Sequence, residues 1–140
     1  MKFMEFKTME KYGIADMLAI MRILRSEDGC PWDREQTHQS IKKNLIEETD
    51  EVIAAIDNSD LENLKEELGD LLLQVVFHSQ ISEENGGFDF SDVVNCVCQK
   101  LVSRHTHVFG GENAQTAQTA EEAVENWNNA KKAELKSIDN

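Results

Sequence analysis

Apolar residues recur every three or four positions in five stretches of the chain, and this periodicity predicts an all-α fold. The first helix is expected to end near Arg25, ahead of the turn-forming residues 26–29 and Pro31. Its apolar stripe consists of Ile14, Met17, Leu18, Met21 and Leu24. The pattern contains no internal repeat and no β-strand alternation of any length. The expected architecture is a helical bundle of about five helices.

The second and third helices are predicted to form an antiparallel hairpin. The second runs from about residue 40 to residues 55–57, and the third from about residue 61 to 83. Residues 58–60 alone link them, and so short a linker forces the two helices to fold back on each other. Asp60 is a suitable N-cap for the third helix. Positions expected to face inward are Leu45, Val52, Ile56, Leu64, Leu68, Leu71 and Leu72.

The later part of the third helix, residues 71–77, is apolar nearly all round. A surface helix of a small monomer needs only one apolar face. We therefore expect this helix to be central in the bundle and to meet a second subunit, which predicts a homodimer. A fourth helix is expected from Ser91, and the last begins at a capping box of Thr119 and Glu122.

Composition and charge narrow the class of protein. A chain of 140 residues with 40% hydrophobic and 29% charged residues is typical of one soluble domain. We assign residues 12–140 to that domain and residues 1–11 to an extension that is either a helical turn or a tail. The net charge of −13 argues against general binding to nucleic acid or anionic membranes.

The location predicted from sequence is the cytoplasm. No signal peptide is visible, and no apolar run is long enough to span a bilayer. Three cysteines cannot form a closed disulfide set, which suits a reducing compartment. Cys96 and Cys98 lie in an apolar helical run, where they are expected to be small core residues.

Carboxylates are concentrated on the predicted hairpin. Residues three apart share a helix face, so Glu48 projects with Glu51 and Glu67 projects with Asp70. Antiparallel packing would bring these four side chains together. Two carboxylates about 4 Å apart repel by roughly 4 kcal/mol at an effective dielectric near 20. A cation is therefore expected among them, and oxygen ligands favour Mg²⁺, with Mn²⁺ as a possible substitute.

Residues 30–40 are predicted to be a loop of unusual content. Trp32 either covers an end of the bundle or contributes to substrate binding. His38 and His78 are expected to be hydrogen-bonded structural residues. Ser40 is a candidate N-cap for the following helix.

Four motifs in series resemble one family. In order they read GCPWDREQTHQS, EExxE, EELGDLLLQVVFHS and KLxxRHxHVFG, and they cover most of residues 12 to 131. This series resembles the MazG nucleoside triphosphate pyrophosphohydrolases of the all-α NTP pyrophosphatase superfamily. The resemblance implies hydrolysis of a nucleoside triphosphate between its α and β phosphates.

The resemblance also implies roles for individual residues. It puts Mg²⁺ on the quartet that spacing had selected, and Glu47 is either the residue that orients the attacking water or a solvated glutamate. Lys100 and Arg104 would meet the triphosphate, or else are surface cations of an acidic protein. Trp127 and Lys131 would lie near the nucleotide, although Trp127 could equally be a core or interface residue. Residues 103–107 lack one basic residue and the proline that many members of the family carry.

Other functions remain open at this point. A di-iron carboxylate bundle would need two Glu-x-x-His motifs, and the chain has one, at Glu35 and His38 in the predicted loop. A regulatory dimer could bind Mg-nucleotide without turnover. Within the enzyme class, a narrower substrate such as dUTP, dCTP or phosphoribosyl-ATP is possible, because no feature of the sequence reads a base.

Overall fold

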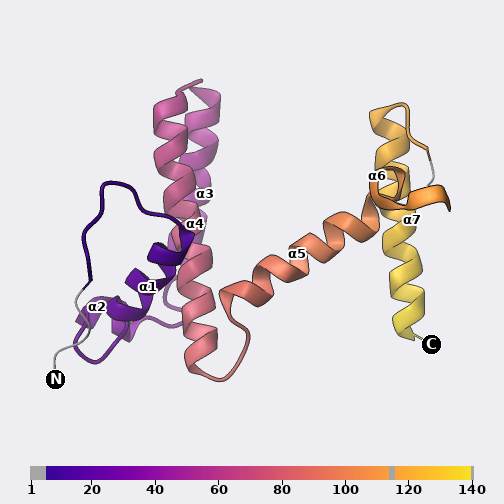
Figure 1. The fold of residues 1–140 in the computed structure, drawn as a ribbon. Helices are drawn as coiled ribbons and strands as arrows, with labels where there is room; N and C mark the ends of the chain where they lie inside the picture. The colour runs from indigo at the N-terminus through magenta and orange to yellow at the C-terminus, as the bar shows by residue number, and fades with distance from the viewer. Residues whose placement is uncertain (1–5, 114–115, 140) are drawn as a thin grey trace. The chain divides into compact units, whose positions relative to one another are not determined.

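The computed structural model describes residues 6–113 and 116–139. Within these ranges the chain is helical and no β-strand is assigned, so the predicted all-α class is confirmed (Figure 1). The helices, in order, are α1 (Ile14–Leu24), α2 (Pro31–Glu35), α3 (Lys42–Asp57), α4 (Leu61–Glu84), α5 (Phe90–Arg104), α6 (Thr106–Phe109), the 3₁₀ turn η1 (Gly111–Asn113) and α7 (Ala120–Asp139). Among the described residues, every helix is too short or too polar to cross a lipid bilayer.

The chain divides into two compact units, and the second begins at Ser91. In the first unit, α4 packs against α3 along the hairpin and against α1 (Figure 1). Asp60 caps α4 as predicted, since its Oδ1 accepts a hydrogen bond from the Asn63 backbone N–H at 3.1 Å. Residue Ser59 takes up a positive φ of 52° in the turn, which lets three residues reverse the chain.

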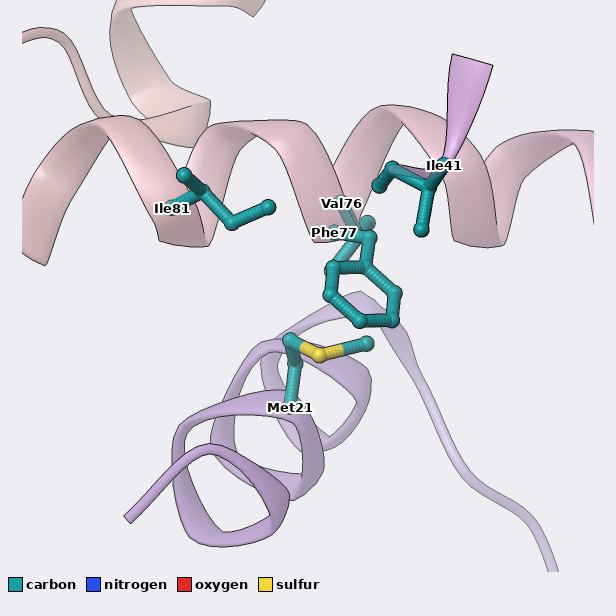
Figure 2. Packing of buried hydrophobic residues seen from close by; sticks show 5 residues of the cluster. All are labelled: Met21, Ile41, Val76, Phe77 and Ile81. Atoms are coloured by element: carbon teal, nitrogen blue, oxygen red, sulfur yellow. The ribbon is translucent and has the colours of Figure 1, made fainter. Parts of the chain in front are cut away.

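The core of the first unit lies where α1, α4 and the start of α3 meet. Its buried members are Met21, Ile41, Val76, Phe77 and Ile81 (Figure 2). Met17, Leu18, Leu73 and Phe90 pack around them and are partly buried. Full burial of an aliphatic or aromatic side chain contributes about 1.5–3 kcal/mol. This cluster therefore fixes α1 on α4 and leaves the far end of the hairpin to other contacts.

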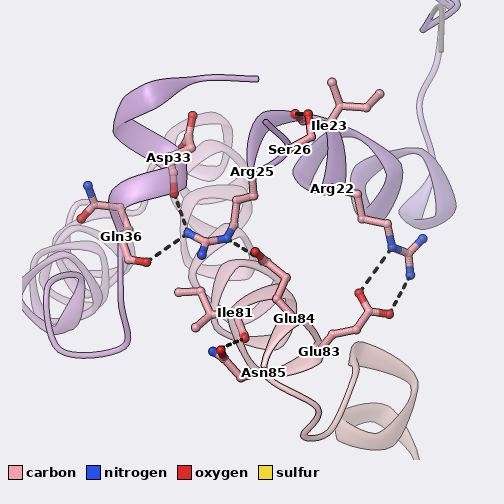
Figure 3. A network of polar contacts seen from close by, with 10 residues as sticks. All are labelled: Arg22, Ile23, Arg25, Ser26, Asp33, Gln36, Ile81, Glu83, Glu84 and Asn85. Carbon is pink, nitrogen blue, oxygen red and sulfur yellow. Dashed lines mark hydrogen bonds and ion pairs between the residues drawn. The ribbon is translucent and has the colours of Figure 1, made fainter. Parts of the chain in front are cut away.

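A helix stands where the sequence predicted only a loop. Residues 31–35 form α2, with Pro31 in the first turn, where its missing N–H costs nothing. The Arg25 guanidinium holds α2 in place by donating to the backbone oxygens of Asp33 and Gln36 at 2.5 and 3.1 Å (Figure 3). Arg25 also pairs with Glu84 at 2.7 Å, so one buried cation joins α1, α2 and α4.

Two predictions near α2 are wrong. Trp32 does not cover the end of a bundle, because it is 54% exposed and meets Phe77 only edge-on, with ring centroids 6.3 Å apart. Ser40 does not cap α3. Its hydroxyl instead donates to Gln36 Oε1 at 2.7 Å, and Ile41 occupies the N-cap position.

Several apolar residues predicted to face inward are exposed in the single chain. On the hairpin, Val52 is buried, whereas the exposed residues are Leu45, Ile56, Leu68 and Leu72. The reason is that α3 packs chiefly against α4, which leaves the other sides of α3 uncovered, and that α1 covers only part of α4. Cys96 and Cys98 are also exposed, because no residue of α5 is buried.

The second unit carries α5, α6, η1 and α7. Its predicted capping box is present in part: Glu122 N–H donates to Thr119 Oγ1 at 3.2 Å. The Glu122 carboxylate accepts from the Gln118 N–H at 2.7 Å, one residue earlier than in the standard motif. Of the N-terminal extension, Phe3 lies outside the described residues, and residues 6–13 form no helix.

Candidate metal centre

The four carboxylates selected by spacing converge between α3 and α4. Glu48 and Glu51 come from α3, and Glu67 and Asp70 come from α4. One oxygen from each lies within 4.8 Å of those of the other three. The hairpin explains this convergence, because its short turn sets the two helices antiparallel with their i, i+3 pairs facing each other.

Crowding perturbs the acids of this quartet. A hydrogen bond with Glu51, followed by burial and the charges of Glu51, Asp70 and Glu48, raises the pKa of Glu67 to about 7. Burial, followed by the charges of its neighbours, also raises the pKa of Glu48. Like charges held this close disfavour ionisation, so Glu67 remains partly protonated at neutral pH in the metal-free chain.

The donor set fits a hard divalent cation. Glu48 Oε2 and Glu67 Oε2 are buried, and no described residue donates a hydrogen bond to either. A buried carboxylate oxygen without a donor is costly unless a cation satisfies it. All four ligands offer oxygen, which Mg²⁺ and Mn²⁺ prefer, whereas structural zinc sites use Cys and His.

Glu47 stands beside the quartet without joining it. Its side chain is exposed, and its charge is the smallest of the causes that raise the pKa of Glu48. A carboxylate that is close to a metal site and still open to water is suited to hold a water molecule rather than to act as a ligand.

A row of polar side chains that was not predicted from the sequence continues along one face of α4 beyond the quartet. Gln74 and His78 follow Asp70 at successive intervals of four residues, so they share its helix face. Gln74 Oε1 and His78 Nε2 are buried, and no described residue hydrogen-bonds to either atom. The i, i+4, i+8 spacing was the available signal, but Gln74 sits in a run that is otherwise apolar.

His78 pairs with His38 across the first unit. Their Nδ1 atoms are 2.7 Å apart, and the two rings stack with centroids separated by 5.0 Å. Burial, with a smaller contribution from the charge of His38, lowers the pKa of His78. The lowered pKa favours the neutral form of His78, which can donate or accept one hydrogen bond through Nδ1. This agrees with the expected structural role for both histidines.

The second unit gathers several of the residues predicted to bind substrate. Lys100 and Arg104 lie one turn apart on α5 and line an open cavity of about 660 Å³. The Arg104 guanidinium lies over the Trp127 ring, 5.2 Å from its centroid. Lys131 is exposed and does not line this cavity.

The fold and the quartet together define the class: an all-α protein with a carboxylate centre suited to a divalent cation. The family model of the MazG nucleotide pyrophosphohydrolase domain matches residues 36–109, just over half of the chain. The chain therefore belongs to the MazG family, as the four sequence motifs predicted.

Individual relatives agree with this assignment. A Thermotoga maritima protein named nucleoside triphosphate pyrophosphohydrolase/pyrophosphatase MazG is 53% identical over 104 residues, which are 73% of this chain and 41% of that protein. The nucleoside triphosphate pyrophosphohydrolase of Escherichia coli K12 is 43% identical over 127 residues, 88% of this chain and 48% of the relative. The chain thus spans less than half the length of these two relatives.

A solved structure shares the fold. The crystal structure of a mazG-related protein from Thermotoga maritima aligns with a TM-score of 0.68 at 29% sequence identity. The alignment covers 85% of this chain and 99% of that protein.

Proposed function

We propose that this chain hydrolyses nucleoside triphosphates at the α–β phosphate bond and releases a nucleoside monophosphate and pyrophosphate. The observation that carries the proposal is the convergence of four carboxylates within 4.8 Å, with two buried oxygens that lack donors, in a member of this family. The names of the relatives support the choice of reaction. Clearance of unwanted nucleotides from the cellular pool is the physiological role that this reaction suits.

The quartet is proposed to hold Mg²⁺, or Mn²⁺ in its place. When bound, the cation supplies charge neutralisation for the phosphate oxygens and lowers the cost of gathering carboxylates beside a polyanion. Glu48, Glu51, Glu67 and Asp70 would be its ligands, because their oxygens converge. Glu67, whose pKa is about 7, can release its proton to the cation near neutral pH.

The remaining residues are proposed to orient the reactants. Glu47 would accept a hydrogen bond from the attacking water and take its proton as the oxygen bonds to the α phosphorus. The bond from that phosphorus to the bridging oxygen breaks, and pyrophosphate leaves. Lys100 and Arg104 would bind the β and γ phosphates, while Trp127, Lys131 and Trp32 are proposed to contact the nucleotide.

The products distinguish this reaction from its rivals. Incubation with Mg²⁺ and a panel of ribo- and deoxyribonucleoside triphosphates is expected to yield monophosphate and pyrophosphate in equal amounts. Glu67→Gln should reduce turnover by at least about 100-fold, because it removes a ligand at the reacting centre. Glu66→Gln is the matched control, since Glu66 is exposed on the same helix and outside the quartet.

Release of orthophosphate would contradict the proposed bond cleavage. Binding of Mg-nucleotide without any turnover would favour a regulatory dimer instead. Activity confined to one nucleotide in the panel would identify a narrower substrate within the same reaction.

A further inference from the structure

We infer that Glu134 is a positioning residue that holds the Arg104 guanidinium in place for a phosphate group. The inference rests on the proposed function in one respect, which is the assignment of Arg104 to the triphosphate. Neither the sequence motifs nor the matched family region points to Glu134, which lies on α7 beyond residue 109. The contacts that assign it all lie within the second unit.

Arg104 is fixed on two sides. Its Nε and Nη2 atoms donate to Glu134 Oε2 at 3.2 and 3.0 Å. Its guanidinium carbon lies over the indole ring of Trp127, which also meets the His105 ring with centroids 5.2 Å apart. The Arg104 side chain is only 13% exposed, so few other rotamers are open to it. A long flexible side chain is thereby held in one orientation.

Glu134 is itself held in place. Its second oxygen, Oε1, accepts a hydrogen bond from Ser103 Oγ at 2.8 Å. That bond, followed by those from Arg104, lowers the pKa of Glu134, with a further contribution from the charge of Lys100. Both oxygens of the carboxylate are therefore engaged, and the group stays ionised at neutral pH.

This arrangement leaves part of Arg104 available for a ligand. A guanidinium carries five N–H bonds in a rigid fork, and the contact with Glu134 uses Nε and Nη2 but not Nη1. Arg104 lines the same open cavity as Lys100 and Ser103. A phosphate entering that cavity would meet a guanidinium whose orientation is already set, which reduces the entropy lost on binding.

The alternative is that Glu134 occupies the phosphate position and must leave when a phosphate binds. The two roles predict opposite effects of Glu134→Gln. Loss of a negative charge by itself strengthens binding of a polyanion, and loss of a competitor does the same. Loss of positioning weakens binding, so the sign of the change separates the two roles.

The test uses inorganic tripolyphosphate as the probe, titrated calorimetrically into the full chain in EDTA at low salt. Omission of the metal makes the result independent of hydrolysis and of the quartet. Glu134→Gln is expected to raise the Kd by about tenfold, because a misplaced binding group loses most of its orientation benefit. Glu125→Gln, an exposed glutamate of the same helix, measures the pure charge effect and should leave the Kd unchanged or slightly lower.

Two further variants keep the test decisive. Glu134→Asp keeps the charge and should recover part of the lost affinity. Ser103→Ala frees Glu134 Oε1 without removing the ion pair, so it should raise the Kd by a smaller factor in the same direction, even if Glu134→Gln does not fold. An unchanged or lower Kd in both Glu134→Gln and Ser103→Ala overturns the inference, as does a wild-type chain that fails to bind tripolyphosphate.

Turnover supplies a second readout that a purely structural residue would not produce. In an active wild-type enzyme, Glu134→Gln should raise KM for the nucleoside triphosphate by about tenfold and leave kcat within about twofold, as loss of uniform binding does. A fall in kcat at unchanged KM would contradict a positioning role in binding. If the wild type binds tripolyphosphate but turns over no nucleotide, the proposed function fails and the inference about Glu134 still stands or falls on the Kd values.

Discussion

Glu67 binds its proton more tightly in the folded chain than in an unfolded one, because Glu51 shares a hydrogen bond with it and two further acids, Asp70 and Glu48, crowd it. Its folded pKa is about 7, against 4.5 for an unperturbed glutamate. A raised carboxyl pKa means that the native state holds more protons, so stability falls as pH rises between these two values. This contribution is complete below about pH 4.5 and is lost by the time the pH passes about 7.

We therefore predict that the metal-free chain becomes less stable as pH rises from 5 toward 7.5. The measurement is urea unfolding in EDTA across that range for the wild type and for Glu67→Gln. The difference between the two isolates the contribution of Glu67 to stability. His78, whose pKa is lowered, contributes the opposite slope to both proteins, and that contribution cancels.

Mg²⁺ at about 100 times its Kd should add about 2.7 kcal/mol to the stability of the wild type at pH 8. It should add much less at pH 5.5, because protons compete for the ligands.

Glu67→Gln should lose most of the Mg²⁺ stabilisation, whereas Glu66→Gln should keep it. Equal stabilisation of wild type and Glu67→Gln would show that the ion binds elsewhere. A metal-free wild type whose stability does not fall relative to Glu67→Gln as pH rises would show that the carboxylates are not crowded in solution.

The quartet could be predicted from sequence because it needs only helix periodicity and a short turn. The His38–His78 pair could not, because the two residues lie 40 positions apart. Their contact depends on how the segment after α2 crosses α4, which no local pattern encodes. The contact between Arg104 and Glu134 could not be predicted for the same reason. The sequence of the segment that joins α5 to α7 does not indicate how it brings the two helices together.

At the scale of elements, the long helices could be predicted and α2 could not. An apolar period of 3.6 residues needs several turns to become visible, which α1, α3, α4 and α7 provide. The five residues of α2 are too few to show one, and a side chain of α1 holds this helix through backbone oxygens. Apolar periodicity also does not reveal which of two apolar faces a neighbour covers, and this explains the wrong burial expected for Leu45 and Leu68.

Two glycines should respond to alanine in opposite ways. A Cβ added at Gly29, in the turn between α1 and α2, would collide with the backbone oxygens of Ile23 and Leu24. Gly29→Ala should therefore destabilise the chain by about 1–3 kcal/mol, as overpacking does.

Gly69 lies within α4, and a Cβ added there has no atom within 4 Å. Gly69→Ala should stabilise the chain by about 1 kcal/mol through helix propensity. Chemical unfolding of both variants in EDTA checks the pair, and a stabilising Gly29→Ala would contradict the tight turn.

At the scale of the whole molecule, the hairpin presents two apolar stripes to solvent. On α3 the stripe consists of Leu45, Ile46, Ile53 and Ile56. On α4 it consists of Leu61, Leu68, Leu72 and Val75. In each helix these positions repeat at helical spacing, and on α3 the stripe borders the buried face that carries Val52 and Ala55. Exposed apolar residues grouped along two neighbouring helices in this way are uncommon on a monomer and mark an interface.

We predict that a second copy of the chain covers these stripes, so that two hairpins pack as a four-helix arrangement. Sedimentation equilibrium should give a mass of about twice 15.9 kDa. Ile53→Asp places a charge in the middle of the α3 stripe. It should yield a monomer, because association would remove the hydration shell of the carboxylate at a high free-energy cost. The melting temperature of this variant should be lower than that of the wild type. Ala54→Asp adds the same charge one residue further along the same helix, at an exposed position outside the apolar stripe, and should remain dimeric. A monomeric wild type at micromolar concentration would contradict the prediction. Equal dissociation of both variants would show that net charge, rather than the stripe, controls association.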